Sequence, residues 1–153
     1  MSSGDAIDEM PPELVEFLAG GRLVVASTLD AEGAPYTMVM NSAMAIDPLT
    51  LRFSLDRRTQ TLKNIEADGR MMFEIIGDGM IYGVRGTARV IVAQMLHAPL
   101  PSAMVEVGVE AVKRDLPPGV LVTAPAFDWA ALGAFMAPVE PLMFAEMRAF
   151  RSE

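Results

Sequence analysis

The sequence contains no cysteine, and this absence excludes disulfide bonds, thiolate catalysis and cysteine-ligated metals. Histidine is almost as scarce, because His97 is the single one in 153 residues. It lies in a connection that also holds Pro99 and Pro101, without a recognisable set of further ligands. An isolated histidine is weak evidence for a metal centre or a catalytic triad, so we predict no metal site.

Long apolar runs are also missing. No stretch reaches the length of a membrane-spanning helix, and the acidic N-terminus lacks the layout of a signal peptide, in which basic residues precede apolar ones. We therefore expect a cytoplasmic protein with no membrane partner. Basic residues are outnumbered, with 12 Lys and Arg against 20 Asp and Glu, which gives a net charge of −8. A chain of this charge repels a polyanion, so we predict no nucleic-acid partner.

Apolar residues, by contrast, make up 52% of the chain, and 13 of them are methionines. This composition is richer than that of a typical soluble monomer and predicts that some surface is buried against a second copy. The methionines fit an adaptable core or interface better than a metal site. The length predicts one domain over residues 1–153, with residues 1–10 as a flexible tail and residues 128–151 as a C-terminal helical segment.

Six segments have the alternation or the β-branched content of strands. They are residues 23–29, 35–47, 51–55, 70–76, 80–92 and 104–110. Helices are expected over residues 11–18 and after residue 59, and two more at the C-terminus, where Pro138 ends the first and Pro141 begins the second. Short, closely spaced strands with few helices predict a mainly β (α+β) fold, a small antiparallel barrel of six strands.

The main candidate site is a basic corner, residues 56–65, between a strand and a short helix. Three basic side chains lie here beside two threonine hydroxyls. Because the start of a helix also leaves backbone N–H groups unpaired, this combination suits an anion, above all a phosphate. The alternative interpretation is a solvated surface, which such clusters often are. The acidic background of the chain makes the local cluster less expected by chance.

The strand at residues 35–47 has one face of small and partly polar side chains. That row is Thr37, Val39, Asn41, Ala43, Ala45 and Asp47. Small side chains leave room for a flat ligand, and Asn41 offers both a donor and an acceptor to a ring edge. Packing against another strand or a second subunit would use the same residues. Similarly, Arg85, Thr87 and Arg89 share one face of their strand and either pair with surface carboxylates or face the ligand.

Taken in order, these segments resemble the pyridoxamine 5′-phosphate oxidase-like family of flavin-binding split β-barrels. The resemblance covers about residues 11–112 and rests on the Gly20-Gly21 pair and on the segments that follow it, residues 22–28, 34–40, 51–54, 59–65 and 69–71. The stretch after Asp115 does not resemble the segment with which the true oxidases recognise the pyridoxal substrate.

The resemblance implies a homodimer with two FMN molecules in clefts at the subunit interface. It implies that the basic corner holds the phosphate and that residues 38–41 and Ser54 lie along the isoalloxazine ring. The implied cofactor-binding residues are Met38, Val39, Met40, Asn41, Ser54, Arg57, Arg58, Thr59, Thr61 and Lys63. Trp129 is a candidate for stacking on the ring from the partner subunit. The residues alone assign no catalytic side chain.

The corner departs from the family pattern at one point. Many members carry a Ser-Arg-Lys run where this chain has Thr59, Gln60 and Thr61, so two positive charges are missing. A charge-assisted hydrogen bond is worth on the order of 1.5 to 3 kcal/mol, so losing two weakens binding roughly a hundredfold or more. Arg57, Arg58 and Lys63 are the neighbours that can compensate.

Our first functional hypothesis is an FMN-dependent oxidoreductase that acts on an unknown small substrate, because a flavin brings its own redox chemistry. The alternative is a non-catalytic dimer that carries or senses a flavin, the deazaflavin F420 or haem. The single histidine makes haem ligation the weakest of these options. A structural dimer without a ligand is the third hypothesis.

Overall fold

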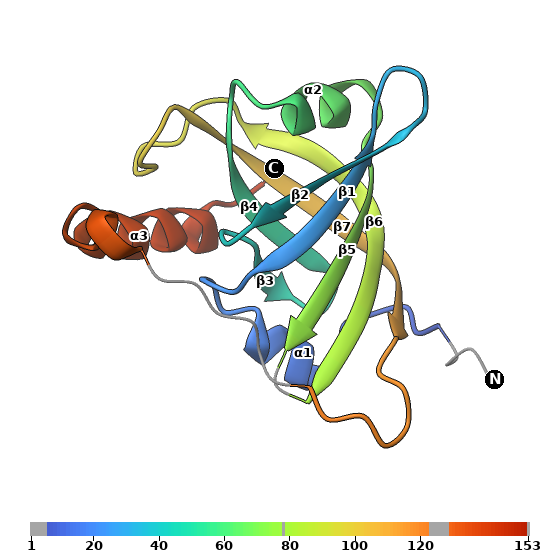
Figure 1. Cartoon of the computed structure of the whole chain (residues 1–153). Coiled ribbons are helices and arrows are strands. Elements are labelled where there is room, and N and C mark those ends of the chain that lie inside the picture. Colours follow the sequence, from blue (N-terminus) through green and yellow to red (C-terminus); the bar gives the residue numbers. More distant parts are fainter. Residues whose placement is uncertain (1–5, 78, 123–128, 153) are drawn as a thin grey trace.

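The computed structural model describes residues 6–77, 79–122 and 129–152. Seven antiparallel strands form one sheet in the order β2-β1-β5-β6-β7-β4-β3. The strands are β1 (Val24–Leu29), β2 (Pro35–Met40), β3 (Met44–Asp47), β4 (Thr50–Asp56), β5 (Arg70–Gly77), β6 (Met80–Val92) and β7 (Ser102–Arg114). The helices are α1 (Pro12–Phe17), α2 (Gln60–Ala67), the 3-10 turn η1 (Ala130–Leu132) and α3 (Gly133–Ala149). The sheet curls into a barrel with α2 across one end, α1 at the other and α3 on the outside (Figure 1).

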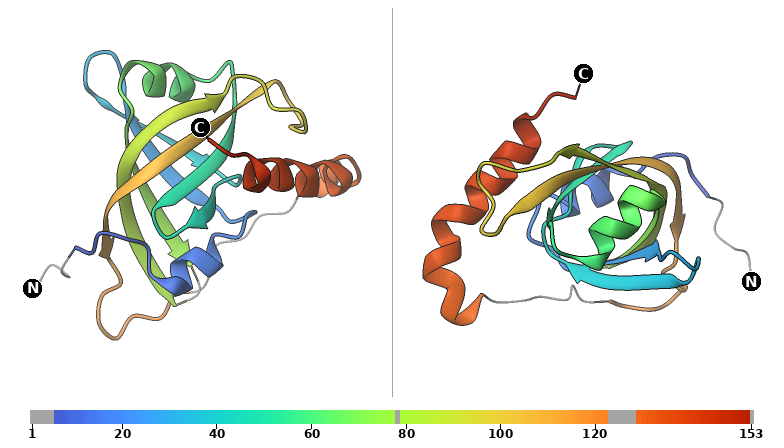
Figure 2. Two further views of the ribbon diagram at one scale, coloured as in Figure 1. Left: turned by 180° about the vertical axis from the view of Figure 1, so that it is seen from behind. Right: turned by 90° about the horizontal axis from the view of Figure 1, so that it is seen from above.

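The predicted mainly β fold with flanking helices is confirmed, but the predicted number of six strands is wrong. Residues 35–47 form two strands, because the chain leaves β2 after Met40 and begins β3 at Met44. These two strands are the opposite edges of the sheet, which curls round beneath α2 (Figure 2). Ser42, in the link between them, donates its hydroxyl to the Ser54 carbonyl at 2.8 Å and accepts from the Ser54 N–H at 3.2 Å. The link is thereby fixed to β4.

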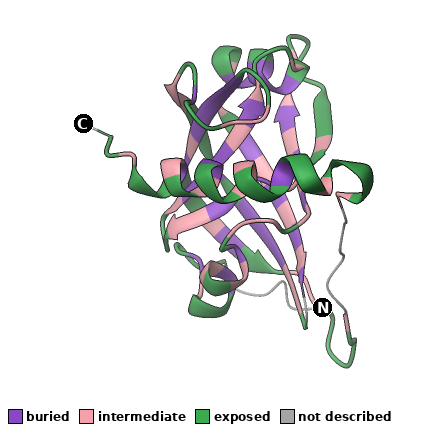
Figure 3. Cartoon of the chain, turned by 90° about the vertical axis from the view of Figure 1, so that its left-hand side faces the viewer, coloured by how far each residue is buried: buried purple, intermediate pink, exposed green. Residues whose placement is uncertain are grey.

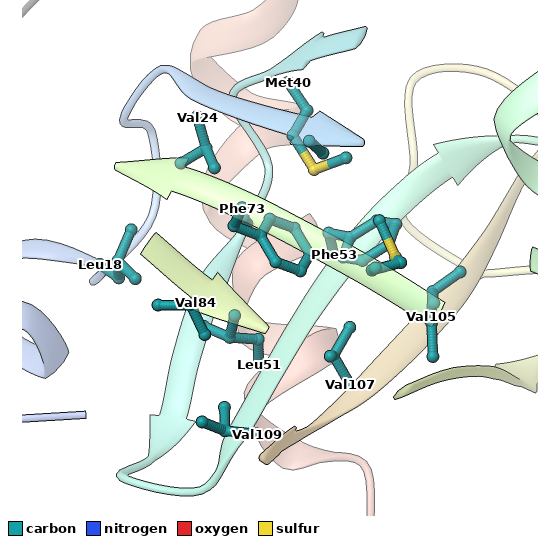
Figure 4. Close-up of a cluster of buried hydrophobic side chains, with 14 of the residues drawn as sticks. Leu18, Val24, Met40, Leu51, Phe53, Phe73, Val84, Val105, Val107 and Val109 are labelled. Atoms are coloured by element: carbon teal, nitrogen blue, oxygen red, sulfur yellow. The ribbon is translucent and has the colours of Figure 1, made fainter. Parts of the chain in front are cut away.

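The core fills the barrel with the inward faces of the strands. Along β4, Leu51, Phe53 and Leu55 are buried as the alternation predicts, but Arg52 between them is buried as well. The rings of Phe53 and Phe73 meet edge to face with their centroids 6.0 Å apart (Figure 4). On β7, Val105 and Val107 point into the same cluster (Figure 4). This core fixes β4, whose end carries the basic corner.

The predicted flexible tail is wrong for the residues that the structure describes before α1. Ile7 and Val112 exchange two backbone hydrogen bonds of 2.8 Å, and Met10 is buried. This segment therefore packs against the barrel, because it pairs with β7 and buries an apolar side chain.

The two predicted C-terminal helices are one continuous helix, α3, which includes both Pro138 and Pro141. Residue 128, the predicted start of the C-terminal helical segment, lies outside the described residues. α3 crosses the outside of the barrel and is exposed over much of its surface (Figure 3). Its inward side chains Met143 and Met147 enter a second buried cluster, which also contains Met44, Met95 and Met104. Among the described residues, no helix combines the length and hydropathy needed to span a bilayer.

Candidate functional site

The basic corner forms where β4 ends and α2 begins. Thr59 is the N-cap of α2, and its hydroxyl accepts a hydrogen bond from the Leu62 N–H at 3.3 Å. The same hydroxyl donates to the Asp56 carbonyl at 2.9 Å. At the inner side of α2, the buried Asn64 donates to Thr28 Oγ1 on β1 at 3.0 Å. The N-terminus of α2 is thus held in a fixed position against the barrel.

Arg58 is held at the corner by Asp56. Its Nη2 and Nε donate to the Asp56 carboxylate at 2.7 and 3.1 Å, and its backbone N–H adds a third bond at 2.9 Å. The Arg58 side chain, which remains 75% exposed, lowers the pKa of Asp56 to about 2 through these hydrogen bonds. The exposed Arg57 donates to Gln94 Oε1 at 3.2 Å. Three basic side chains, including Lys63, against one carboxylate leave two net positive charges in residues 56–63.

Two of the predicted phosphate ligands are less available than the sequence indicates. Thr61 is only 2% exposed, so its side chain faces the protein interior. The hydroxyl of Thr59 is engaged as the helix cap. Arg57, Arg58 and Lys63 are the predicted corner residues whose side chains are exposed to solvent.

A small cavity lies beside the corner, against the link between β2 and β3. Its volume is about 140 Å³. It is lined by Asn41, Ser42, Ser54, Asp56, Pro99, Leu100, Ser102, Trp129, Met136 and Met143. Asp56 also pairs with Arg58, so the cavity and the basic corner are adjacent. The structure therefore brings the predicted Asn41 and Ser54 together next to the predicted phosphate site.

The other predicted ring contacts, on β2, point elsewhere. Met40 is buried in the barrel core and Met38 packs against the same core, whereas Val39 is 59% exposed on the outer face. None of these three side chains lines the cavity beside the corner. In this part of the chain the cavity is lined by Asn41, the residue directly after β2, and not by the strand itself.

The far wall of the cavity comes from the C-terminal segment, in which only Trp129 was a predicted ring contact. Trp129, predicted to stack on the ring from a partner subunit, lines the cavity of its own chain. Its indole Nε1 donates to Glu140 Oε2 at 2.9 Å. Met136 and Met143 were missed, because their approach to β4 is long-range and leaves no local pattern in the sequence.

Other surface groups favour the solvated interpretation that the sequence left open. Arg89 pairs with Glu106 at 2.9 Å, and Thr87 bonds to Glu110. Two larger hollows contain none of the implied cofactor-binding residues, but Arg85, which the sequence left open as a ligand-facing residue, lines one of them. One, of about 440 Å³, is lined by Arg70, Arg85 and parts of β1 and β5, and another, of about 520 Å³, lies between α3 and the loop of His97.

Within the described ranges, no group of three or more His, Asp or Glu side chains could hold a metal ion.

Comparison with solved structures supports the fold. An F420 reductase superposes with a TM-score of 0.57 at 19% identity, covering 67% of this chain and 98% of the other. The HupZ protein of Group A Streptococcus gives 0.60 at 20% identity, covering 76% and 100%. A Lactobacillus delbrueckii protein, provisionally assigned as a pyridoxamine 5′-phosphate oxidase, gives 0.62 at 19% identity, covering 72% and 98%. At these identities the likeness concerns the fold alone. Comparison with curated protein sequences found no significant match.

Membership of a family rests on the sequence itself. The sequence profile described as pyridoxamine 5′-phosphate oxidase matches residues 10–128, which include the whole sheet and the basic corner. This range is well over half of the 153 residues. The chain therefore belongs to the pyridoxamine 5′-phosphate oxidase-like family.

Proposed function

We propose that the protein binds FMN and acts as an oxidoreductase on a small substrate. The observation that carries this proposal is the adjacency of the basic corner and the cavity that contains Asn41 and Ser54. A phosphate site beside an opening with polar groups at one edge is what a flavin mononucleotide requires.

The corner fits a phosphate in charge and in donors. A phosphate monoester carries about 1.5 to 2 negative charges near neutral pH, and residues 56–63 carry two net positive charges. The N-terminus of α2 adds backbone N–H groups and the positive end of the helix dipole. Arg57, Arg58 and Lys63 would hold the phosphate in place of the two charges that the Thr59-Gln60-Thr61 run lacks. The fit therefore rests on net charge more than on hydrogen bonds from side chains in fixed positions.

The polar and apolar groups that line the cavity suit the chemistry of the flavin ring. Asn41 offers an amide donor and acceptor and Ser54 a hydroxyl, while Met136, Met143 and Trp129 offer apolar surface. When bound, FMN supplies the redox chemistry through its ring. The role of the protein is to orient the ring with Asn41 and Ser54 and to exclude water with the methionines.

The chain offers a matched pair of variants to test the corner. Arg58 and Arg70 each bond to the aspartate two residues earlier, at 2.7 Å, and their side chains are 75% and 73% exposed. Arg58 lies at the start of α2 and Arg70 beyond its end, beside the 440 Å³ hollow. Arg58→Ala should weaken FMN binding roughly tenfold, the effect of one charge-assisted hydrogen bond, and Arg70→Ala should leave it unchanged. The measurement is a titration followed by flavin fluorescence. Weaker FMN binding by Arg70→Ala, with unchanged binding by Arg58→Ala, would instead place the phosphate site at the 440 Å³ hollow.

The alternative function is a dimer that carries a flavin, F420 or haem without turnover. The structural likeness to an F420 reductase is the observation that favours F420 as the second ligand to test. The visible spectrum of the purified protein separates flavins from haem, because the cofactor determines the absorption. A steady-state assay with NADH or NADPH then separates an enzyme from a carrier, since a carrier gives no multiple turnover.

We also propose that the protein is a homodimer in the cytoplasm. Edge strand β2 presents Tyr36 and Val39, which are 41% and 59% exposed, next to unpaired backbone groups. Covering these side chains with a second copy would account for the high apolar content of the chain. Sedimentation velocity tests this directly, and Val39→Glu should shift the population toward monomer. A wild-type protein that sediments as a monomer over the accessible concentration range would reject the dimer.

A further inference from the structure

Helix α3 is apolar on two opposite sides. One side packs on the barrel through Met136, Met143 and Met147, which are buried. The other side faces away from the barrel and is exposed (Figure 3). Nine positions of α3 are exposed, and eight of these carry apolar residues, namely Ala134, Phe135, Ala137, Pro138, Pro141, Leu142, Ala145 and Ala149. A helix that is apolar all round is normally buried all round, so a partner that covers this face is expected.

Helix α2 of the same chain shows the usual pattern instead. Its exposed positions are Gln60, Lys63, Glu66 and Ala67, three of which are polar or charged. The family profile matches residues 10–128, so it includes α2 but ends before α3. The apolar outward face is therefore a feature of the C-terminal segment of this chain and not of the part that defines its family.

The exposed apolar surface around α3 is large enough for a subunit contact. Leu132, Phe135 and Leu142 lie along it, and Leu96 lines the same hollow as Leu142. These four side chains are between 50% and 84% exposed. At roughly 150 to 200 Å² for a large apolar side chain, they expose about 400 Å². One partner in a standard interface buries roughly 800 Å², so this face, with its alanines and prolines added, predicts a weak but specific contact.

The distribution of charge favours a second copy of this chain as the partner. Two copies of net charge −8 repel wherever their carboxylates meet. On α3, however, both carboxylates are half-buried and engaged within their own chain. Glu140 accepts from the indole of Trp129 at 2.9 Å, and Glu146 accepts from two backbone N–H groups of the loop after β6, at 2.6 and 2.9 Å. Arg148 is the one charged residue among the nine exposed positions of α3, so two acidic copies can meet here without opposing carboxylates.

The face is also complementary to itself. Phe135, Leu142 and Ala149 follow one another at seven-residue intervals, which is two turns, so they lie on one side of the helix. If two α3 helices lie antiparallel with Leu142 at a two-fold axis, Phe135 of each copy meets Ala149 of the other. A large side chain thus faces a small one, as close packing requires.

A hollow is present where this arrangement needs one. It measures about 520 Å³ and lies beside Ala149, with Leu96, Leu142 and Ala145 also in its lining. A cavity of roughly 150 Å³ holds a benzene molecule, so the phenyl ring of Phe135 from a second copy has room to enter.

We propose that the outward face of α3 is an interface between copies of this chain, in which two α3 helices pack antiparallel about a two-fold axis near Leu142. Helix α3 and strand β2 lie on different sides of the barrel (Figure 2). The α3 contact is therefore additional to the dimer proposed through β2, and it joins two such dimers into a tetramer as the concentration rises. It does not depend on FMN.

The lack of native cysteine allows a direct test. Leu142→Cys introduces the single thiol of the chain, and beside a two-fold axis two such thiols come close enough for a disulfide. Leu49→Cys is the matched control, because Leu49 is 51% exposed and Leu142 50%, but Leu49 lies in the turn between β3 and β4. After oxidation by dissolved oxygen, non-reducing electrophoresis should show most of the Leu142→Cys chain as a covalent dimer and little of the Leu49→Cys chain. Equal cross-linking of the two variants, or none in Leu142→Cys, would overturn the proposal.

Sedimentation velocity over a range of concentrations separates this contact from the one through β2. The wild type should pass from dimer to tetramer. Leu142→Glu should weaken that step more than about a hundredfold, because like charges then meet at the axis, and Leu49→Glu should leave it unchanged. If Leu142→Glu sediments as the wild type does at every concentration, the α3 contact is overturned, with no consequence for β2. If only Val39→Glu sediments like the wild type, the β2 dimer is overturned and the α3 contact stands. Binding to phosphatidylcholine vesicles that is lost in Leu142→Glu would assign the face to a lipid surface and overturn the proposal.

Discussion

Arg52 on β4 donates two hydrogen bonds to Glu106 on the neighbouring strand β7, from Nε at 2.9 Å and from Nη2 at 2.7 Å. This pair is shielded from water, since the side chains are 6% and 12% exposed. It orients the remaining nitrogen of Arg52 toward the last carbonyls of α3, which carry the negative end of the helix dipole. The relationship between these two residues thus joins the barrel to the helix that walls the candidate site.

Removal of Arg52 should therefore destabilise the protein and loosen α3. Arg52→Ala leaves Glu106 largely buried without its main partner, which costs about 3 kcal/mol or more of unfolding free energy. Arg89→Ala is the matched control, because Arg89 bonds to the other oxygen of Glu106 but is 62% exposed. Its loss should cost less than about 1 kcal/mol. Urea unfolding gives both values, and equal costs would contradict the anchoring role of Arg52.

Gly86 should tolerate no side chain. A Cβ at this position of β6 would overlap the carbonyl oxygen of Gly108 and lie 2.7 Å from Val107 Cγ1 on β7. Gly86→Ala should cost about 1 to 3 kcal/mol through overpacking in the sheet. Gly108→Ala is the control, since a Cβ there meets no atom within 4 Å. Thermal unfolding of the two variants should show a large loss for the first alone, and a similar loss for both would contradict the packing described.

Glu74 should make stability depend on pH. Partial burial, together with the hydrogen bond and charge of Asp115, raises the pKa of Glu74 to about 7 from an ordinary 4.5, while Lys113 opposes the shift. The folded state thus binds this proton more tightly than the unfolded state does. The contribution is fully present below pH 4.5 and is lost as the pH rises through about 7.

The variant Glu74→Gln should remove this dependence. Its stability relative to wild type should increase between pH 5 and pH 7.5, because glutamine keeps a polar amide there without acquiring a charge. Glu66→Gln, at an exposed position of α2, serves as the control. Unfolding free energies measured across this pH range give the answer. A constant difference between Glu74→Gln and wild type would show that Glu74 titrates normally.

Much of the fold could be predicted from local sequence patterns. The alternation of Leu51, Phe53 and Leu55 indicates a strand with one buried face, and the structure buries all three. The division of residues 35–47 could not be predicted, because the alternation runs on while the hydrogen bonds of Ser42 turn the chain. The helix through Pro138 and Pro141 was missed for a related reason. Packing of Met136, Met143 and Met147 on the barrel outweighs the local cost of the two prolines.

The candidate site, like the fold, could be predicted from the sequence only in part. The basic corner is contiguous in sequence, so its charges and hydroxyls were recognisable. The burial of Thr61 was not, because the side of a helix that faces the protein interior depends on how the helix docks on the barrel. The wall from α3 joins residues about 80 positions apart, such as Ser54 and Met136, and no local signal connects them.

The central claim is that this chain binds FMN through the corner and the adjacent cavity. The most direct test is a titration of the purified apo protein with FMN, followed by flavin fluorescence and checked by equilibrium dialysis for stoichiometry. The account predicts saturable, equimolar binding of FMN to the chain. Riboflavin, which lacks the phosphate, should bind more weakly, because it does not engage the two net positive charges of the corner. No saturable binding at high micromolar FMN would contradict the claim and turn attention to F420 or to a protein without a cofactor.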